Sequence, residues 1–247
     1  MKRTVLFLVF SIAILVAKAS PRADESAFAV ANKAYSENRF QDAADGYQNL
    51  LNSGHWNASL FYDLGNARYR LGDFGQAILN YERALALDPR HPEAEANLRL
   101  ARDEARALEM RRDPLERYIS MATVKQYSIV AAIGFWLAIF VTAQMFMSRP
   151  RSAGRITLLA LSILVCGLSI FGIVTLENGV RGNALAIVTG KNVEARLATA
   201  DNAKSILVLP AGSEVNILSE RGDWIYAVLP NDERGWIPAN GAQRVRL

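Results

Sequence analysis

Apolar and polar residues follow three different patterns along this chain of 247 residues, and each pattern predicts a different kind of structure. Between residues 24 and 111, apolar positions recur at helical spacing. Residues 127–147 and 156–176 carry no charge and are long enough to cross the apolar core of a bilayer as helices. From residue 184 onward the pattern alternates every two residues, which is typical of short β-strands. The sequence therefore predicts a multidomain protein with an all-α region, a pair of transmembrane helices and a small all-β domain.

The helical region repeats with a period of 34 residues. This period is typical of tetratricopeptide repeats, in which helix–turn–helix units stack into a ribbon with a concave face. The predicted domain covers residues 24–112, with repeats at 24–57 and 58–91 and a capping helix at 92–111. An ordinary bundle of two helical hairpins is the alternative. The identical pairs under the shift are Asn32/Asn66, Tyr35/Tyr69, Phe40/Phe74, Ala43/Ala77, Tyr47/Tyr81 and Leu51/Leu85.

The second repeat carries the pattern more completely than the first. Gly65 is small enough for two helices to approach closely, Gly72 lies at the predicted turn, and Pro89 ends the second helix. In the first repeat Asn38 stands at the turn position. Asparagine tolerates a left-handed backbone, so we still expect a turn there.

The N-terminus has the pattern of a secretory signal peptide. Lys2 and Arg3 precede an apolar run over residues 5–17, and Ala17-Lys18-Ala19 forms a cleavage motif. We expect residues 1–19 to be the signal peptide, with an uncleaved anchor as the alternative. In either case the repeat region would be exported.

The short connector at 148–155 predicts that the two apolar helices form an antiparallel hairpin. The connector contains three arginines, which favours a cytoplasmic location for it. A similar number of basic residues precedes the first span, so the charge difference between the two ends of the hairpin is too small to decide its orientation. Export of the repeats decides the orientation. We expect a bacterial inner-membrane protein with a cytoplasmic loop at 148–155 and periplasmic domains on both sides of the hairpin. Burial of both helices in the core of a soluble protein is the alternative.

The C-terminal segment, residues 182–247, is predicted to be a small barrel or sandwich. The expected strands are 184–188, 193–198, 205–209, 214–219, 224–229 and 235–238. The runs Leu209-Pro210-Ala211-Gly212-Ser213-Glu214-Val215, Gly222-Asp223-Trp224 and Gly235-Trp236-Ile237-Pro238 resemble a bacterial SH3 domain. This resemblance implies an SH3-like barrel that could bind peptidoglycan. The family's usual start is altered here to Asn192-Val193-Glu194-Ala195-Arg196-Leu197, which lacks the Gly-Pro turn.

The order of the parts, from signal peptide and repeats to hairpin and SH3-like tail, resembles the BatE-like proteins of the Bacteroides aerotolerance (Bat) operon family. That resemblance implies a scaffold in envelope or oxidative stress tolerance. It also implies partners among von Willebrand A-domain membrane proteins associated with MoxR-type ATPases.

Charge and composition restrict the possible chemistry. Residues 20–113 contain 12 basic and 15 acidic side chains, and residues 177–247 contain 8 of each, so neither exported region predicts a nucleic-acid partner. Cys166 is the single cysteine, and the histidines His55 and His91 have no neighbours at metal-ligand spacing. The acidic residues Asp63, Asp73 and Asp88 are expected at helix starts or turns. We expect no catalytic residues, metal or cofactor, and hence no enzyme.

A protein-binding groove is predicted on the first helix of each repeat. Asparagine can donate to and accept from a peptide backbone, tyrosine offers apolar area with a polar tip, and arginine can pair with a carboxylate. For the tyrosines, packing between helices is an equally strong alternative. The predicted groove residues are Phe28, Asn32, Tyr35, Tyr62, Asn66, Tyr69 and Arg70.

Overall fold

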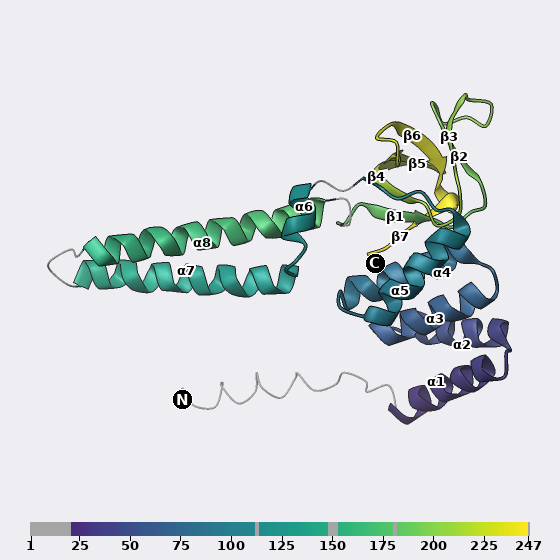
Figure 1. Ribbon diagram of the computed structural model, residues 1–247, viewed down its shortest axis with the longest axis horizontal. Coiled ribbons are helices and arrows are strands. Elements are labelled where there is room, and N and C mark those ends of the chain that lie inside the picture. The colour runs from purple at the N-terminus through teal and green to yellow at the C-terminus, as the bar shows by residue number, and fades with distance from the viewer. Residues whose placement is uncertain (1–20, 112–113, 148–152, 180–181, 247) are drawn as a thin grey trace, which may run out of the picture. The chain divides into compact units, whose positions relative to one another are not determined.

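The computed structural model describes residues 21–111, 114–147, 153–179 and 182–246 (Figure 1). The expected signal peptide and residues 148–152 of the expected cytoplasmic loop lie outside these ranges. The chain divides into two compact units, one ending at Trp56 and the other beginning at Asn57.

The first unit is a pair of packed helices, α1 (Pro21–Ser36) and α2 (Phe40–Asn52). Gly46 allows their close approach, because a Cβ atom there would lie 2.9 Å from the Cβ of Ala31. Asn38 has a φ of 61°, which confirms the left-handed turn expected at this position.

The second unit begins with three helices, α3 (Ala58–Arg70), α4 (Phe74–Leu87) and α5 (Pro92–Ala105). Side chains cap the start of each: Asn57 accepts from the Leu60 amide, Asp73 from the Gln76 amide and His91 from the Ala94 amide. The turn between α3 and α4 contains Gly72 with a φ of 73°.

The capping helix is shorter than the expected range of 92–111. Helix α5 ends at Ala105, and Arg106 takes a left-handed conformation with φ 50°. The next residues bond to the sheet: the Leu108 amide donates to Ser213 Oγ at 3.1 Å, and the Glu214 amide donates to the Leu108 carbonyl at 2.9 Å. The sheet thus satisfies backbone groups that a longer helix would have satisfied internally.

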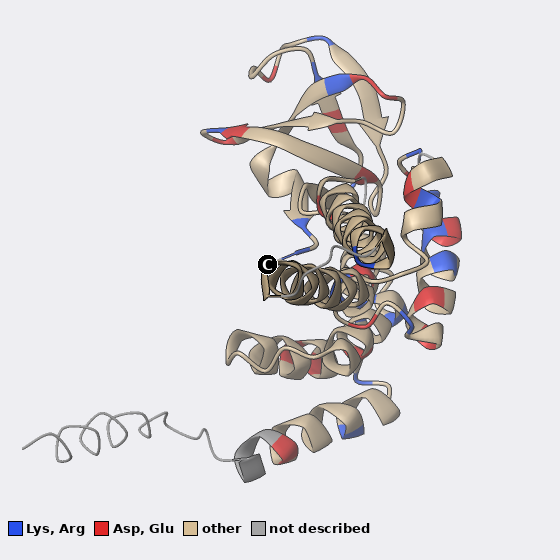
Figure 2. Cartoon of the chain, turned by 90° about the vertical axis from the view of Figure 1, so that its left-hand side faces the viewer, with Lys and Arg blue, Asp and Glu red and all other residues tan. Residues whose placement is uncertain are grey.

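Two long apolar helices follow the short helix α6 (Pro114–Ile119). They are α7 (Val124–Met147) and α8 (Ala153–Asn178), and each contains the range expected for it. Both are long and apolar enough to cross a membrane, and only 11% and 17% of their most apolar windows are buried. In Figure 2 these two helices, viewed nearly end-on, are tan over most of their length, which means that they carry few charged residues. Such low burial disfavours the alternative of core helices in a soluble protein.

Small residues line the contact between α7 and α8. A Cβ at Gly134 would lie 3.1 Å from the Ser162 carbonyl oxygen, and one at Gly172 would lie 2.9 Å from the Tyr127 ring. Ser162 and Ser169 are buried. Small side chains allow the backbones of membrane helices to approach closely.

The C-terminal region is an antiparallel sheet with seven described strands in the order β3-β2-β6-β5-β4-β1-β7. Six of the strands overlap the expected ones, and the last was not expected. Along β5, Ile225 and Ala227 are buried while the alternating residues Trp224, Tyr226 and Val228 are half-buried, as the two-residue pattern predicts. The strands are β1 (Leu185–Val188), β2 (Val193–Arg196), β3 (Ser205–Leu209), β4 (Glu214–Arg221), β5 (Trp224–Val228), β6 (Arg234–Pro238) and β7 (Ala242–Arg244).

The sheet shares one apolar core with helices α4 and α5. Leu185 and Ile187 of β1, together with Val245, pack against α4 and α5. Two glycines let the chains approach here. A Cβ at Gly75 would lie 3.1 Å from the Thr189 backbone, and a Cβ at Gly212 would lie 2.2 Å from Ile78 Cδ1. Helices α4 and α5, which precede the apolar hairpin, and the sheet that follows it therefore pack together within the second unit.

Candidate protein-binding site

The predicted groove residues lie on the first helix of each pair. Phe28, Asn32 and Tyr35 are on α1, and the other four are on α3. Because α1 and α3 belong to different units, each set is described on its own.

Asn66 is the centre of a hydrogen-bond network that connects α3, α4 and α5. Its Oδ1 atom accepts from the Tyr81 hydroxyl at 2.8 Å and from Asn97 Nδ2 at 2.9 Å. Asn97 Nδ2 also lies 3.3 Å from the Tyr62 hydroxyl. The carbonyl half of the Asn66 side chain is thus occupied by the fold, which the sequence interpretation did not foresee.

The amide half of Asn66 remains available. Among the described residues, its Nδ2 atom has no hydrogen-bond partner, and it is not among the buried unpaired atoms, so water reaches it. A side-chain amide can donate two hydrogen bonds. The network therefore holds two donors in place at a half-buried position on α3.

The first helix pair repeats these contacts 34 residues earlier. The Tyr47 hydroxyl donates to Asn32 Oδ1 at 2.7 Å, as Tyr81 does to Asn66. The ring pair Phe28–Tyr47, at 6.0 Å between centroids, corresponds to Tyr62–Tyr81 at 6.1 Å. The identities found under the shift are therefore accompanied by repeated contacts.

The tyrosines of α3 pack on one side and are partly exposed on the other. The ring of Tyr62 lies 4.9 Å from that of His91, and the ring of Tyr69 meets Phe74 edge-on at 5.5 Å. Both tyrosines are half-buried against the shared core, whereas Arg70 is exposed. Packing between helices thus accounts for one side of each ring, and the part of these tyrosines in partner binding stays a prediction.

Asp63 also lies on α3, inside the helix and not at its start, so the expected capping role does not apply. Burial raises the pKa of its carboxyl group to about 6, and the nearby His91 lowers the pKa in part. A carboxylate in this environment would gain from a donor or cation supplied by a ligand.

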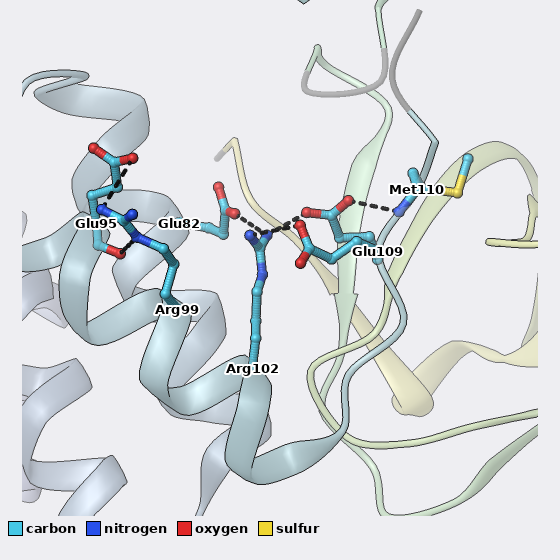
Figure 3. Close-up of polar contacts among 7 residues, drawn as sticks. Glu82, Glu95, Arg99, Arg102, Glu109 and Met110 are labelled. Carbon is cyan, nitrogen blue, oxygen red and sulfur yellow. Dashed lines mark hydrogen bonds and ion pairs between the residues drawn. The ribbon is translucent and has the colours of Figure 1, made fainter.

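A second polar cluster joins the helices to the sheet (Figure 3). Arg102 on α5 donates through Nη2 to Glu82 of α4 at 2.6 Å and to Glu214 of β4, and through Nη1 to Glu109 at 3.1 Å. The other Glu214 oxygen accepts from the Met110 amide at 2.9 Å. The side chains of Arg102, Glu82 and Glu214 are 7%, 4% and 0% exposed, so this is an interior ion cluster and not a surface for partners.

Sequence patterns gave no direct signal for either network. Under the 34-residue shift Arg102 falls on Arg68 and Asn97 on Asp63, but neither pairing indicates the partners that the two α5 residues contact. Some of their partners are distant in sequence, as in the pair Arg102–Glu214, whose members lie before and after the apolar helices α7 and α8. Only the fold brings these residues together.

The described residues contain no group of three or more potential metal ligands close together. The family model of the tetratricopeptide repeat matches residues 58–91, the same range expected for the second repeat. No curated protein matches the chain. The helix pair α3–α4, with the Asn66 network on its first helix, is therefore a tetratricopeptide repeat, a unit that suggests binding of other proteins.

Proposed function

We propose that this protein is a non-enzymatic adaptor of the bacterial inner membrane that binds partner proteins through its repeat helices. The observation that carries the proposal is Asn66, which is half-buried and whose carbonyl is fixed by two internal hydrogen bonds, while no described residue accepts a hydrogen bond from its amide. A donor pair held in place loses little conformational freedom on binding, and it can recognise backbone carbonyls of a peptide whatever its sequence.

Membrane attachment through α7 and α8 raises the effective concentration of partners in the same bilayer. This compensates for the small size of the repeat region, because repeat proteins with fewer than about three units bind through a short surface. The length, apolarity and low burial of the two helices support attachment by a spanning hairpin.

The core that α4 and α5 share with β1 and Val245 supports a location of both regions on the same side of the membrane. The residues on either side of the hairpin must meet to form this core, and an even number of spans returns the chain to the side from which it left. Together with the signal-peptide pattern at 1–19, this favours a periplasmic location for the repeats and the sheet.

The partner class is proposed from the resemblance to the Bat operon family. On this basis the partners are membrane proteins with von Willebrand A domains, acting with MoxR-type ATPases in envelope or oxidative stress. Arg70, exposed at the end of α3, would contact a carboxylate of such a partner.

A second candidate is a peptidoglycan-binding regulator that uses the SH3-like region. The observation that favours it is the ring pair Tyr226–Trp236, with centroids 4.9 Å apart on the neighbouring strands β5 and β6. Both residues are half-buried at the positions that alternate with the core. Co-sedimentation of the full chain with cell-wall sacculi would support this candidate over a protein partner.

The Asn66→Asp variant tests the adaptor proposal without removing the internal network. An aspartate keeps an acceptor for Tyr81 and Asn97 but cannot donate, so we expect the fold to persist and partner affinity to fall about tenfold, as for one hydrogen bond of about 1.4 kcal/mol. The measurement is crosslinking and quantitative co-purification from native membranes, with circular dichroism to report the fold.

The control is Asn49→Asp, which introduces the same charge at an exposed position of α2. It should leave partner recovery unchanged. Equal recovery for wild type and Asn66→Asp, with both proteins folded, would reject this face of α3 as the binding surface.

A further inference from the structure

Helix α6 has two faces with different environments. Glu116 and Ile119 are buried, with 9% and 7% exposure, and α6 packs against α8. Leu115 and Tyr118, one position earlier in each case, are 51% and 71% exposed. Met121, two residues after the helix, is 76% exposed. This short segment therefore presents three large apolar side chains to its surroundings.

The position of α6 is fixed at one end of the apolar hairpin. The Tyr127 hydroxyl, in the first turn of α7, donates to the Ile119 carbonyl at 3.1 Å. A Cβ at Gly179, just after α8, would lie 2.5 Å from Glu116 Oε1. Because α7 begins and α8 ends here, α6 lies at the level where a spanning hairpin leaves the bilayer.

A cavity of about 580 Å³ adjoins this segment. Its lining includes the guanidinium-bearing residues Arg111 and Arg117, together with Pro114, Met110 and Glu109. The Glu109 carboxylate is paired with Arg102 at 3.1 Å, so part of its charge is already balanced within the fold. Arginines are suited to phosphate oxygens, and basic residues next to a membrane helix attract anionic lipid headgroups.

We propose that α6 and the turn after it form a membrane-surface anchor that binds an anionic phospholipid. The phosphate of the lipid lies in the cavity between Arg111 and Arg117, and Leu115, Tyr118 and Met121 enter the boundary between headgroups and acyl chains. Continuity with α7 and α8 identifies the bilayer as the occupant of this apolar face. The inference rests on the membrane crossing in the proposed function, but not on the adaptor role.

Spin labels on single cysteines test the depth of the anchor in the full chain. In a Cys166→Ala background, Tyr118→Cys and Met121→Cys are labelled in nanodiscs that contain phosphatidylglycerol. We expect high collision rates with oxygen and low rates with a water-soluble nickel complex. Glu104→Cys, on the exposed side of α5, is the aqueous control. Water-like accessibility at both 118 and 121 would overturn the anchor.

A label at Trp136→Cys, in the middle of α7, reports the membrane crossing separately. A water-exposed label there would show that the hairpin itself does not span, and would overturn the proposed membrane attachment. A lipid-exposed label at 136 with water-exposed labels at 118 and 121 would overturn only the anchor.

The headgroup site is tested by the enrichment of phosphatidylglycerol over phosphatidylcholine in the lipid that co-purifies with the chain. Neutralising each arginine, in Arg111→Gln and Arg117→Gln, should reduce this enrichment about fivefold, as for about 1 kcal/mol per basic residue at a membrane surface. Arg99→Gln, an exposed arginine on α5 paired with Glu95, should leave the enrichment unchanged. Equal enrichment in all variants, or its loss on adding inorganic phosphate alone, would overturn the lipid site.

Discussion

Replacement of Arg102 by methionine is expected to lower the free energy of unfolding of the body formed by α3–α5 and the sheet by about 3–5 kcal/mol, because it leaves two buried carboxylates without their cation. These carboxylates belong to Glu82 and Glu214, whose side chains are 4% and 0% exposed. When ionised they can only accept hydrogen bonds. The measurement is urea unfolding of the full chain in nanodiscs, followed by circular dichroism and limited proteolysis.

Arg99→Met is the matched control for this experiment, because Arg99 lies one turn earlier on α5 and pairs with Glu95 in solvent (Figure 3). Exposed pairs of this kind contribute about 0–1 kcal/mol. Adding Glu82→Gln and Glu214→Gln to the Arg102→Met variant should restore part of the loss, because the uncompensated charges are removed. Equal destabilisation by Arg102→Met and Arg99→Met would contradict the assignment of the cluster as the link between helices and sheet.

Truncation of Tyr81 is expected to have an effect of similar size on the repeat. Tyr81 is 1% exposed, its ring fills the space left by Gly65, and its hydroxyl donates to Asn66. Removal of a buried aromatic ring costs about 3–5 kcal/mol, so Tyr81→Ala should unfold the repeat at markedly lower urea concentration.

Tyr81→Phe separates the ring from its hydroxyl. It keeps the packing and removes one of the two hydrogen bonds to Asn66 Oδ1, so the expected loss is about 1 kcal/mol. If Tyr81→Phe were as unstable as Tyr81→Ala, the hydrogen bond and not the ring packing would hold α3 and α4 together.

Periodic patterns in the sequence, within single elements and between the two repeats, predicted most of the helices and strands. The 34-residue shift located both helix pairs, and Asn38 was correctly expected to replace a turn glycine. Apolar length located α7 and α8, and the two-residue alternation located six of the seven described strands. Each of these signals comes from local hydrogen bonding or from the period of a single element, which is why the sequence alone carries it.

Contacts between distant segments were not predictable in the same way. The end of α5 at Ala105 depends on hydrogen bonds from residues 108 and 110 to the start of β4, which lies more than a hundred residues further on. The Arg102 cluster likewise depends on Glu214. On α3, the polar identity of Asn66 was recognised, but its internal acceptor role follows from Asn97, whose position the repeat period does not indicate.

The central proposal is that α3, α4, α5 and the sheet form one body on the outer side of a membrane crossed by α7 and α8. Labelling of single cysteines in whole cells tests it most directly, with Cys166→Ala as the background and an impermeant maleimide as the reagent. The account predicts that Glu104→Cys and Asp223→Cys, both at exposed positions, are labelled in intact cells, whereas Ala153→Cys at the start of α8 is labelled only after permeabilisation. Labelling of Glu104→Cys and Asp223→Cys from opposite sides of the membrane would contradict it.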